Sequence, residues 1–362
     1  MQVISRVLFI TAICPVLTFP QPCSALAGAS EKPHAKMPQR GPREHNIALV
    51  LDATYQMNNR DQSCGDTRLN CLLEGVQVFL RNLRPCRTAA PCNDAAGAAD
   101  VVSLFVFPNV TVSTAALDYA CDDPAAPIRA SYTFPPPGAS SYSPLIPPGG
   151  DPPILSTYQI VDYTNNYRIS NRTKSLNEDS SLVRAAGGKP GCGMKAPGGV
   201  GSYFAGAIYA AQASLVAEQT ARPGSQNVLI FASDGWAASS ANRLGGLGNP
   251  SGDYPSSIDE CGQAIRAARE AAAAGTKVYS VALDSQAGKC PTDTSGDFTG
   301  ITACQAMKAI ASAPGLFYSL PNAGSPWKPC ISTAHRQTDY KWVFAQIARS
   351  IDKSHSVGES HP

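Results

Sequence analysis

"NIALVLDATYQMNN", residues 46–59, joins an apolar run to an acidic turn. Residues 47–51 carry no polar side chain, which is typical of a strand whose two faces are both covered. Asp52 ends this run. Because α/β sheets bind ligands outside the carboxyl ends of their strands, the stretch predicts a central strand and the edge of a site.

Strand-like and helix-like segments alternate along the rest of the chain. Apolar runs predict strands at residues 46–52, 101–107, 227–232, 277–283 and 316–320, with an edge strand at 155–163. Helical spacing and alanine-rich stretches predict helices at residues 67–83, 203–220, 257–274, 302–313 and 339–352. The alternation predicts an α/β fold with a doubly wound, mostly parallel, Rossmann-like sheet.

Residues 108–200 interrupt this alternation. Residues 108–153 contain 11 of the 30 prolines, including Pro135-Pro136-Pro137, which removes too many backbone donors for a helix or a central strand. We therefore expect a surface insertion at about 108–200, pinned by cysteines and lying outside the sheet. An independent module is the alternative, since long structureless loops are uncommon in compact domains.

The first 27 residues have the pattern of a signal peptide. A short positive start is followed by apolar residues 7–19 and by Ala25-Leu26-Ala27, which offers the small residues that a signal peptidase reads. We expect cleavage after Ala27, a polar linker at 28–44 and a disordered tail at 353–362. An uncleaved anchor is the alternative, although the apolar run is broken by Pro15 and shorter than the about 20 residues that span a membrane.

Cysteine usage agrees with export. Ten of the 12 cysteines follow the expected cleavage site, and an even number in an exported chain indicates disulfides. These ten are Cys64, Cys71, Cys86, Cys92, Cys121, Cys192, Cys261, Cys290, Cys304 and Cys330. The connectivity stays open: Cys64–Cys71, Cys86–Cys92 and Cys290–Cys304 would close short loops, and Cys121–Cys192 would close the insertion. Zinc would need CxxC pairs or nearby histidines, which are not found.

Two acidic residues follow central strands of the predicted sheet. Asp52 ends the first strand, and Asp234 comes shortly after the strand at 227–232. Their carboxylates would lie over one crevice with the hydroxyl of Thr54 nearby, and hard oxygen ligands of this kind suit Mg²⁺ or Mn²⁺. The alternative is that both aspartates only cap turns or helices, as aspartate often does.

The segments on either side of these aspartates resemble the von Willebrand factor A (VWA) domain family, over about residues 45–352. That family has a metal-ion-dependent adhesion site (MIDAS) with an Asp-x-Ser-x-Ser loop, a later Thr, and an Asp that is often followed by Gly. More narrowly, the chain is similar to the A domain of bacterial TadG-like proteins of tight-adherence pilus assembly. The similar stretches are LVLDATYQMNN, the Cys64–Cys71 spacing, KAPGGVGSYFAGAIYAAQASL, NVLIFASDG and CQAMKAIASAPGLFYS.

The resemblance implies a parallel sheet with one antiparallel edge strand, and a set of metal ligands. Asp52 stands at the first Asp, Thr54 at the first Ser and Asp234 at the last Asp. Ser202 fits the Thr before a helix, whereas Gln56 replaces the second Ser with a longer amide. Since Mg²⁺ requires near-ideal octahedral geometry at about 2.1 Å, the implied Mg²⁺ or Mn²⁺ site is degenerate.

An enzymatic or nucleic-acid function is disfavoured. The five histidines lie near the termini or in a late loop, and Ser202 lacks the G-x-S-x-G setting of a nucleophile. A formal net charge of +2 gives no electrostatic reason to bind nucleic acid or an anionic membrane. The resemblance implies a bacterial, non-catalytic adhesion module, exported to the periplasm, cell surface or medium, that binds a protein, matrix or pilus component. The alternative is a structural component of TadG-like pilus assembly that uses no metal.

Overall fold

The computed structural model describes residues 44–88, 97–110, 157–194, 201–239, 251–284, 288–320, 330–335 and 339–353. The chain divides into two units, residues 1–39 and 40–362, and every described residue belongs to the second. The expected signal peptide and most of the linker and of the tail lie outside the described residues, whereas Lys353, the first residue of the expected tail, ends the last helix. None of the described helices is both long enough and apolar enough to cross a membrane.

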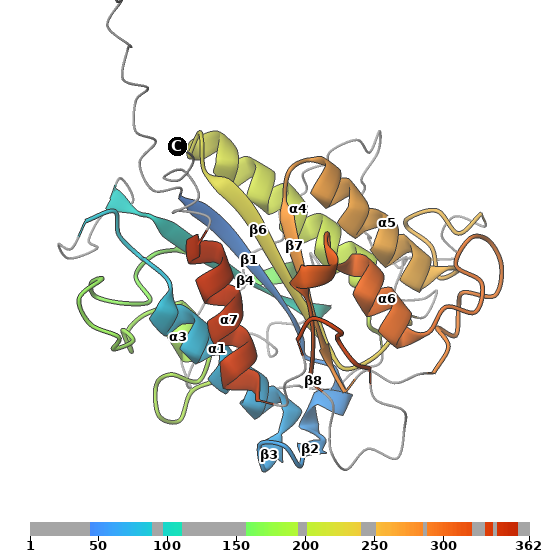
Figure 1. Ribbon diagram of the computed structural model, residues 1–362, viewed down its shortest axis with the longest axis horizontal. Helices are drawn as coiled ribbons and strands as arrows, with labels where there is room; N and C mark the ends of the chain where they lie inside the picture. Colours follow the sequence, from blue (N-terminus) through green and yellow to red (C-terminus); the bar gives the residue numbers. More distant parts are fainter. Residues whose placement is uncertain are drawn as a thin grey trace, which may run out of the picture. The chain divides into compact units, whose positions relative to one another are not determined.

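A six-stranded sheet forms the centre of the second unit, in the order β5-β4-β1-β6-β7-β8 (Figure 1). Its strands are β1 (His45–Asp52), β4 (Asp100–Val110), β5 (Thr157–Thr164), β6 (Gln226–Ser233), β7 (Lys277–Leu283) and β8 (Phe317–Leu320). Only β5 runs antiparallel to its neighbour, and the other adjacent strands are parallel. The predicted α/β fold class and the single antiparallel edge strand are confirmed. Counted along the chain, this is the 3-2-1-4-5-6 order of a doubly wound sheet, whose direction of winding reverses between β1 and β6.

The central strand β1 explains the apolar run that predicted it. All eight of its residues are buried, and it is parallel to both of its neighbours, β4 and β6. Ile47, Leu49 and Leu51 belong to the hydrophobic core on one face of the sheet, and Ala48 and Val50 to the core on the other. Because helices cover both faces, the five residues 47–51 in the middle of the strand are all apolar, and its polar residues lie at the two ends.

Helices form a layer on each face of the sheet (Figure 1). One layer contains α1 (Arg68–Asn82), α3 (Ser181–Ala185) and α7 (Tyr340–Lys353), and the other contains α4 (Phe204–Ala221), α5 (Glu260–Ala273) and α6 (Ala303–Ile310). In α4 the residues from Phe204 to Leu215 are all buried, as in a helix covered on every side. α1 and α7 approach closely because Gly75 lacks a side chain: a Cβ there would lie 2.6 Å from Cδ2 of Phe344.

Short elements connect β1 to α1. They are the 3-10 turn η1 (Tyr55–Asn58) and a two-stranded ribbon of β2 (Arg60–Asp61) and β3 (Asp66–Thr67). Thr67 then caps α1, its hydroxyl accepting a hydrogen bond from the Asn70 backbone at 3.2 Å. A second 3-10 turn, η5 (Pro314–Leu316), leads into β8. The connection after β1 is therefore compact and ordered by local hydrogen bonds.

The second part of the predicted insertion is built into the core, which corrects the expectation that the insertion lies outside the sheet. β5 pairs with β4, from Val102 opposite Thr164 to Val110 opposite Thr157, with register shifts between these two pairs. Beyond β5, Tyr167 is fully buried and α3 contributes to the same hydrophobic core as α1. The physical reason is that β5 completes the edge of the sheet and the chain after it returns under α1. The proline-rich residues 111–156 lie outside the described residues.

Three disulfides are described: Cys64–Cys71, Cys261–Cys290 and Cys304–Cys330. The first was among the pairs suggested by the sequence, whereas the suggested Cys290–Cys304 pair is wrong. Asp293 accepts hydrogen bonds from the backbone N–H groups of Cys261 and Gly262, which holds its loop against the start of α5 and brings Cys290 to Cys261. Cys86 and Cys192 are also disulfide-bonded, while Cys92 and Cys121 lie outside the described residues, so their pairings stay predictions.

Candidate functional site: an acidic crevice closed by an arginine

Three neighbouring strands end in aspartate. Asp52 is the last residue of β1, and Asp234 and Asp284 directly follow β6 and β7. All three are buried, with exposed fractions of 1%, 4% and 5%. They lie at the carboxyl edge of the sheet, beside the point where the strand order reverses, which is where doubly wound folds bind ligands. We call this set of three aspartates and the loops around it the crevice.

Both oxygens of Asp52 accept hydrogen bonds from the protein. Oδ1 accepts from the backbone N–H of Thr54 at 2.8 Å, and Oδ2 from the hydroxyl of Ser233 at 2.7 Å. The Ser233 hydroxyl in turn accepts from the backbone N–H of Gly235 at 3.2 Å. Burial raises the pKa of Asp52, and the hydrogen bonds from Thr54 and Ser233 partly oppose that rise. Asp52 therefore ties together the chain segments that leave β1 and β6.

The guanidinium of Arg68 joins the other two aspartates. Its Nη1 lies 2.5 Å from Oδ2 of Asp234 and its Nη2 lies 2.8 Å from Oδ2 of Asp284. Burial raises the pKa of Asp234 to about 7, with a further contribution from the charge of Asp52, while Arg68 lowers it. Burial also opposes the charge of Arg68, but the two carboxylates raise the pKa of the guanidinium above its ordinary value. The crevice thus contains its own cation, held in a two-pronged ion pair.

Local structure fixes the position of Arg68. It is the first residue of α1, and its backbone N–H donates to the carbonyl of Asn59 at 2.9 Å. The Cys64–Cys71 disulfide joins the residues on either side of it. A cation at the amino end of a helix is disfavoured by the helix dipole, and the first turn of α1 has no acidic residue to offset it. The compensation comes instead from Asp234 and Asp284.

The remaining sequence-predicted ligands lie at different depths. Thr54 is buried beside Asp52, whereas Gln56 is exposed in η1, with its Oε1 3.7 Å from where a Cβ of Gly235 would lie. Ser202 pairs through its backbone with Ala238, in the loop that follows β6. The structure therefore brings Asp52, Thr54 and the end of β6 together, and it places Ser202 on an adjoining loop.

Two members of the site were missed from the sequence. Asp284 had a signal, because the apolar run of KVYSVAL at 277–283 is followed by an aspartate just as LVL is followed by Asp52. Arg68 had a weaker one, as a basic residue at a helix position where the dipole disfavours it. Neither signal shows that the two side chains meet.

The oxygen atoms of the crevice that could ligate a metal do not fit a divalent ion in this arrangement. Asp234 and Asp284 already share the positive charge of Arg68, and both oxygens of Asp52 are engaged by protein donors. The guanidinium would repel a divalent ion about 5 Å away by several kcal/mol even at an effective dielectric constant of about 20, which offsets much of the attraction of the carboxylates. Elsewhere among the described residues, Cys261, Cys290 and Asp293 lie close enough to share an ion, but the two cysteines are consumed in a disulfide.

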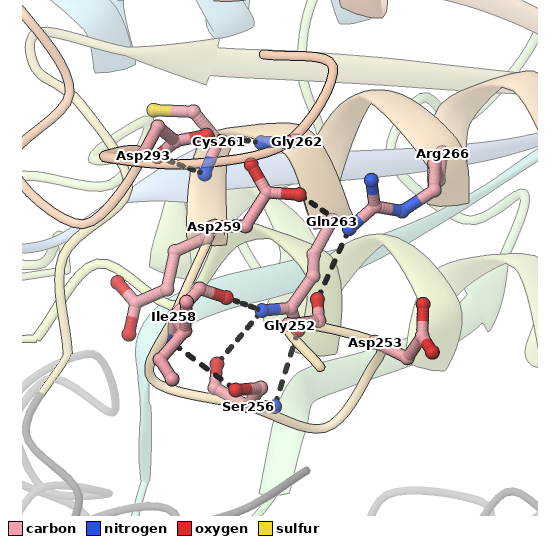
Figure 2. A network of polar contacts seen from close by, with 12 residues as sticks. Gly252, Asp253, Ser256, Ile258, Asp259, Cys261, Gly262, Gln263, Arg266 and Asp293 are labelled. Atoms are coloured by element: carbon pink, nitrogen blue, oxygen red, sulfur yellow. Dashed lines mark hydrogen bonds and ion pairs between the residues drawn. The ribbon is translucent and has the colours of Figure 1, made fainter. Parts of the chain in front are cut away.

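A second polar network braces the loop that follows β6. Asp293 caps the start of α5 through the N–H groups of Cys261 and Gly262, and Asp259 forms an ion pair with Arg266 at 2.7 Å (Figure 2). Glu260 is fully buried and its Oε2 accepts from the backbone N–H of Ser239 at 2.6 Å. Burial raises the pKa of Glu260 to about 8. The network connects α5 to the loops that follow β6 and β7.

The loop that follows Asp52 carries an exposed aromatic residue. Tyr55, three residues beyond Asp52, is 66% exposed, the highest value among the large hydrophobic residues that the structure describes. It begins η1, the turn that also carries Gln56. An exposed tyrosine next to a buried polar site is suited to a protein contact, because its ring supplies apolar area and its hydroxyl a hydrogen bond.

No protein-family model and no curated protein sequence matches the chain. Among solved structures, the pilus adhesin SpaC from Lactobacillus rhamnosus GG is similar with 15% identity and a TM-score of 0.47, over 88% of this chain and 31% of SpaC. Proximal thread matrix protein 1 from the mussel byssus, with a zinc-occupied MIDAS motif, is similar with 10% identity and a TM-score of 0.33, over 86% and 46% of the two chains. The manganese-loaded TRAP protein of Plasmodium vivax is similar with 9% identity and a TM-score of 0.36, over 78% of this chain and 70% of TRAP. This chain thus spans about a third of SpaC, and identities this low do not transfer a ligand or a partner to it.

Proposed function

We propose that the chain is an exported, non-catalytic, VWA-like binding module that recognises a protein or matrix partner through the exposed turn at Tyr55, beside the three aspartates. The observation that carries this proposal is the position of Tyr55, largely exposed and directly beyond the buried end of β1. It stands at the edge of the sheet where doubly wound folds bind ligands. The same edge of the sheet also carries the Asp52–Thr54 hydrogen bond and the Arg68 ion pairs.

The charged groups of the crevice support binding rather than catalysis. Arg68 is committed to Asp234 and Asp284, and Asp52 holds two segments of backbone and side chain in place. Each group therefore has a structural partner instead of a nucleophile to activate. The disulfides support export, since such bonds persist in oxidising compartments.

A scaffold role in TadG-like pilus assembly is the second candidate. The Cys64–Cys71 spacing was part of the resemblance to those proteins, and this disulfide is formed. Cell fractionation separates the two candidates: a scaffold remains with membrane or pilus complexes under mild extraction, whereas a soluble binding module is released.

The main proposal is tested with a matched pair of surface variants. Tyr55→Ala removes the aromatic ring at the crevice, and Ile169→Ala removes a side chain of similar exposure, 61%, from the segment after β5. Cross-linked capture from envelope extract, quantified by mass spectrometry, should show a group of proteins lost at least 10-fold with Tyr55→Ala and retained with Ile169→Ala. If both variants retain the same proteins as the wild type, the turn at Tyr55 is not the contact surface.

A further inference from the structure

We infer that Arg68 is the resident cation of the crevice, and that this chain holds its site together without a divalent ion. The inference concerns how the proposed binding site works, so its link to partner recognition rests on the proposed function. The ion chemistry is independent of any partner. It depends on the arrangement of Arg68, Asp234 and Asp284 at the ends of adjacent strands.

The first argument is charge. Asp234 and Asp284 are buried at the ends of β6 and β7, and neighbouring carboxylates without a counter-ion would repel each other. A guanidinium presents its donors in a rigid fork and can bind two carboxylates at once. Its two terminal nitrogens each contact a different aspartate, so one side chain neutralises the site as an ion would.

The second argument is that Arg68 cannot easily leave. Its backbone belongs to α1, whose start is capped by Thr67 and joined to the preceding loop by the Cys64–Cys71 disulfide. α1 packs closely against α7, because Gly75 in α1 has no side chain that would hold Phe344 of α7 away. The side chain is only 12% exposed. Since the guanidinium is held in place before any ligand arrives, an incoming cation has to displace it rather than fill an open site.

The third argument is what remains when the charge is removed. Replacing Arg68 by a neutral side chain of similar length leaves the carboxylates of Asp234 and Asp284 without their cation, beside the Asp52–Thr54 pair. Oxygen groups of this kind suit Mn²⁺ and Mg²⁺. Loss of the guanidinium should therefore create a cation site that the wild-type chain does not offer.

The test is Mn²⁺ titration of the full exported chain, followed by calorimetry and by water-proton relaxation. We expect no saturable binding by the wild type or by Arg68→Lys up to about 1 mM, and binding at least 10-fold tighter than wild type by Arg68→Met. Arg68→Met combined with Asp234→Asn should lose that gain. Circular dichroism and the melting temperature establish that each variant is folded, and Arg68→Gln takes the place of Arg68→Met if the latter does not fold.

Each outcome separates the alternatives. Stoichiometric Mn²⁺ binding by the wild type overturns the inference, and so does a folded Arg68→Met or Arg68→Gln that binds no more Mn²⁺ than the wild type. A chelator should leave any Tyr55-dependent capture unchanged, and a loss of that capture would also count against Arg68 as the working cation. If Tyr55→Ala alters no capture, the proposed function fails while the ion titration still decides the role of Arg68.

Discussion

Replacing Arg168 by methionine should cost the fold about 3–5 kcal/mol, since each buried carbonyl left unpaired costs about 1–3 kcal/mol, and this is a large part of the roughly 5–15 kcal/mol by which domains are usually stable. Arg168 lies in the segment after β5 that the sequence had placed on the surface, yet it is 3% exposed. Its guanidinium donates to five backbone carbonyls at 2.5–3.1 Å: those of Arg81, Leu83, Ser170, Asn171 and Thr173.

The magnitude follows from where those carbonyls lie. A hydrogen bond to a charged group contributes about 1.5–3 kcal/mol, but the five share one donor group and do not add. Arg81 and Leu83 lie at the carboxyl end of α1, where a cation is favoured by the helix dipole and unpaired carbonyls are costly. The loop carbonyls of Ser170, Asn171 and Thr173 belong to half-buried or exposed residues and can turn to water. Burial lowers the pKa of Arg168, so the cost of desolvating the guanidinium offsets part of the stabilisation that its hydrogen bonds give.

The assay is urea unfolding at pH 7 with the disulfides intact, followed by circular dichroism and tyrosine fluorescence. Arg168→Lys should lose about 2 kcal/mol, because an ammonium keeps the charge but cannot reach both sides of the loop. Arg172→Met, four residues along and exposed, should change stability by less than about 0.5 kcal/mol. An Arg168→Met variant within about 1 kcal/mol of the wild type would refute the reasoning, because its buried carbonyls would then be satisfied without the guanidinium.

Three further changes test the packing, the ionisation and the cross-links. Gly75→Ala should lower the melting temperature by several degrees, since the added Cβ would lie 2.6 Å from Phe344, and overpacking typically costs about 1–3 kcal/mol against a helix-propensity gain of about 1 kcal/mol. Burial raises the pKa of Glu260 from 4.5 to about 8, so the folded protein retains a proton that the unfolded chain loses between these values, and stability should fall as pH rises through that window. Glu260→Gln should flatten this dependence in urea midpoints measured at pH 5 and pH 8.5, and an unchanged slope would exclude Glu260 as its cause. Replacing Cys261 and Cys290 together by serine should cost about 3–4 kcal/mol in the same assay, and a loss below about 1 kcal/mol would mean that the Asp293 contacts alone hold the loop.

Periodic segments could be predicted closely from the sequence. The strand at 277–283 has the predicted bounds. Burial alone determines where such a strand begins and ends, because polar residues flank its apolar run. The predicted helix at 257–274 begins only at Glu260, because Asp259 adopts a left-handed backbone with φ of 56°. The predicted helix at 302–313 ends at Ile310, since Ser312 hydrogen-bonds to Val278 in β7.

The candidate site could be predicted only in part. Asp52, Thr54 and Asp234 follow strands, and the carboxyl ends of parallel strands meet at one edge by geometry. The ion pairs of Arg68 join residues 166 and 216 positions apart, and no local pattern encodes such contacts. The same reason applies to Cys261–Cys290, because loop length says little about which sulfurs meet once the loop after β7 is fixed to α5.

The pairing of Val110 with Thr157 has a consequence for the chain between them. The two residues face each other across the antiparallel β4–β5 pair, so residues 111–156 depart from and rejoin the fold at neighbouring points. The two strands fix only where this connection leaves and rejoins the sheet, so they set no limit on the number of residues between those points. The junction between Val110 and Thr157 is thus a natural insertion point, where a foreign epitope can be added beside the native sequence and Cys121 remains available for its predicted disulfide.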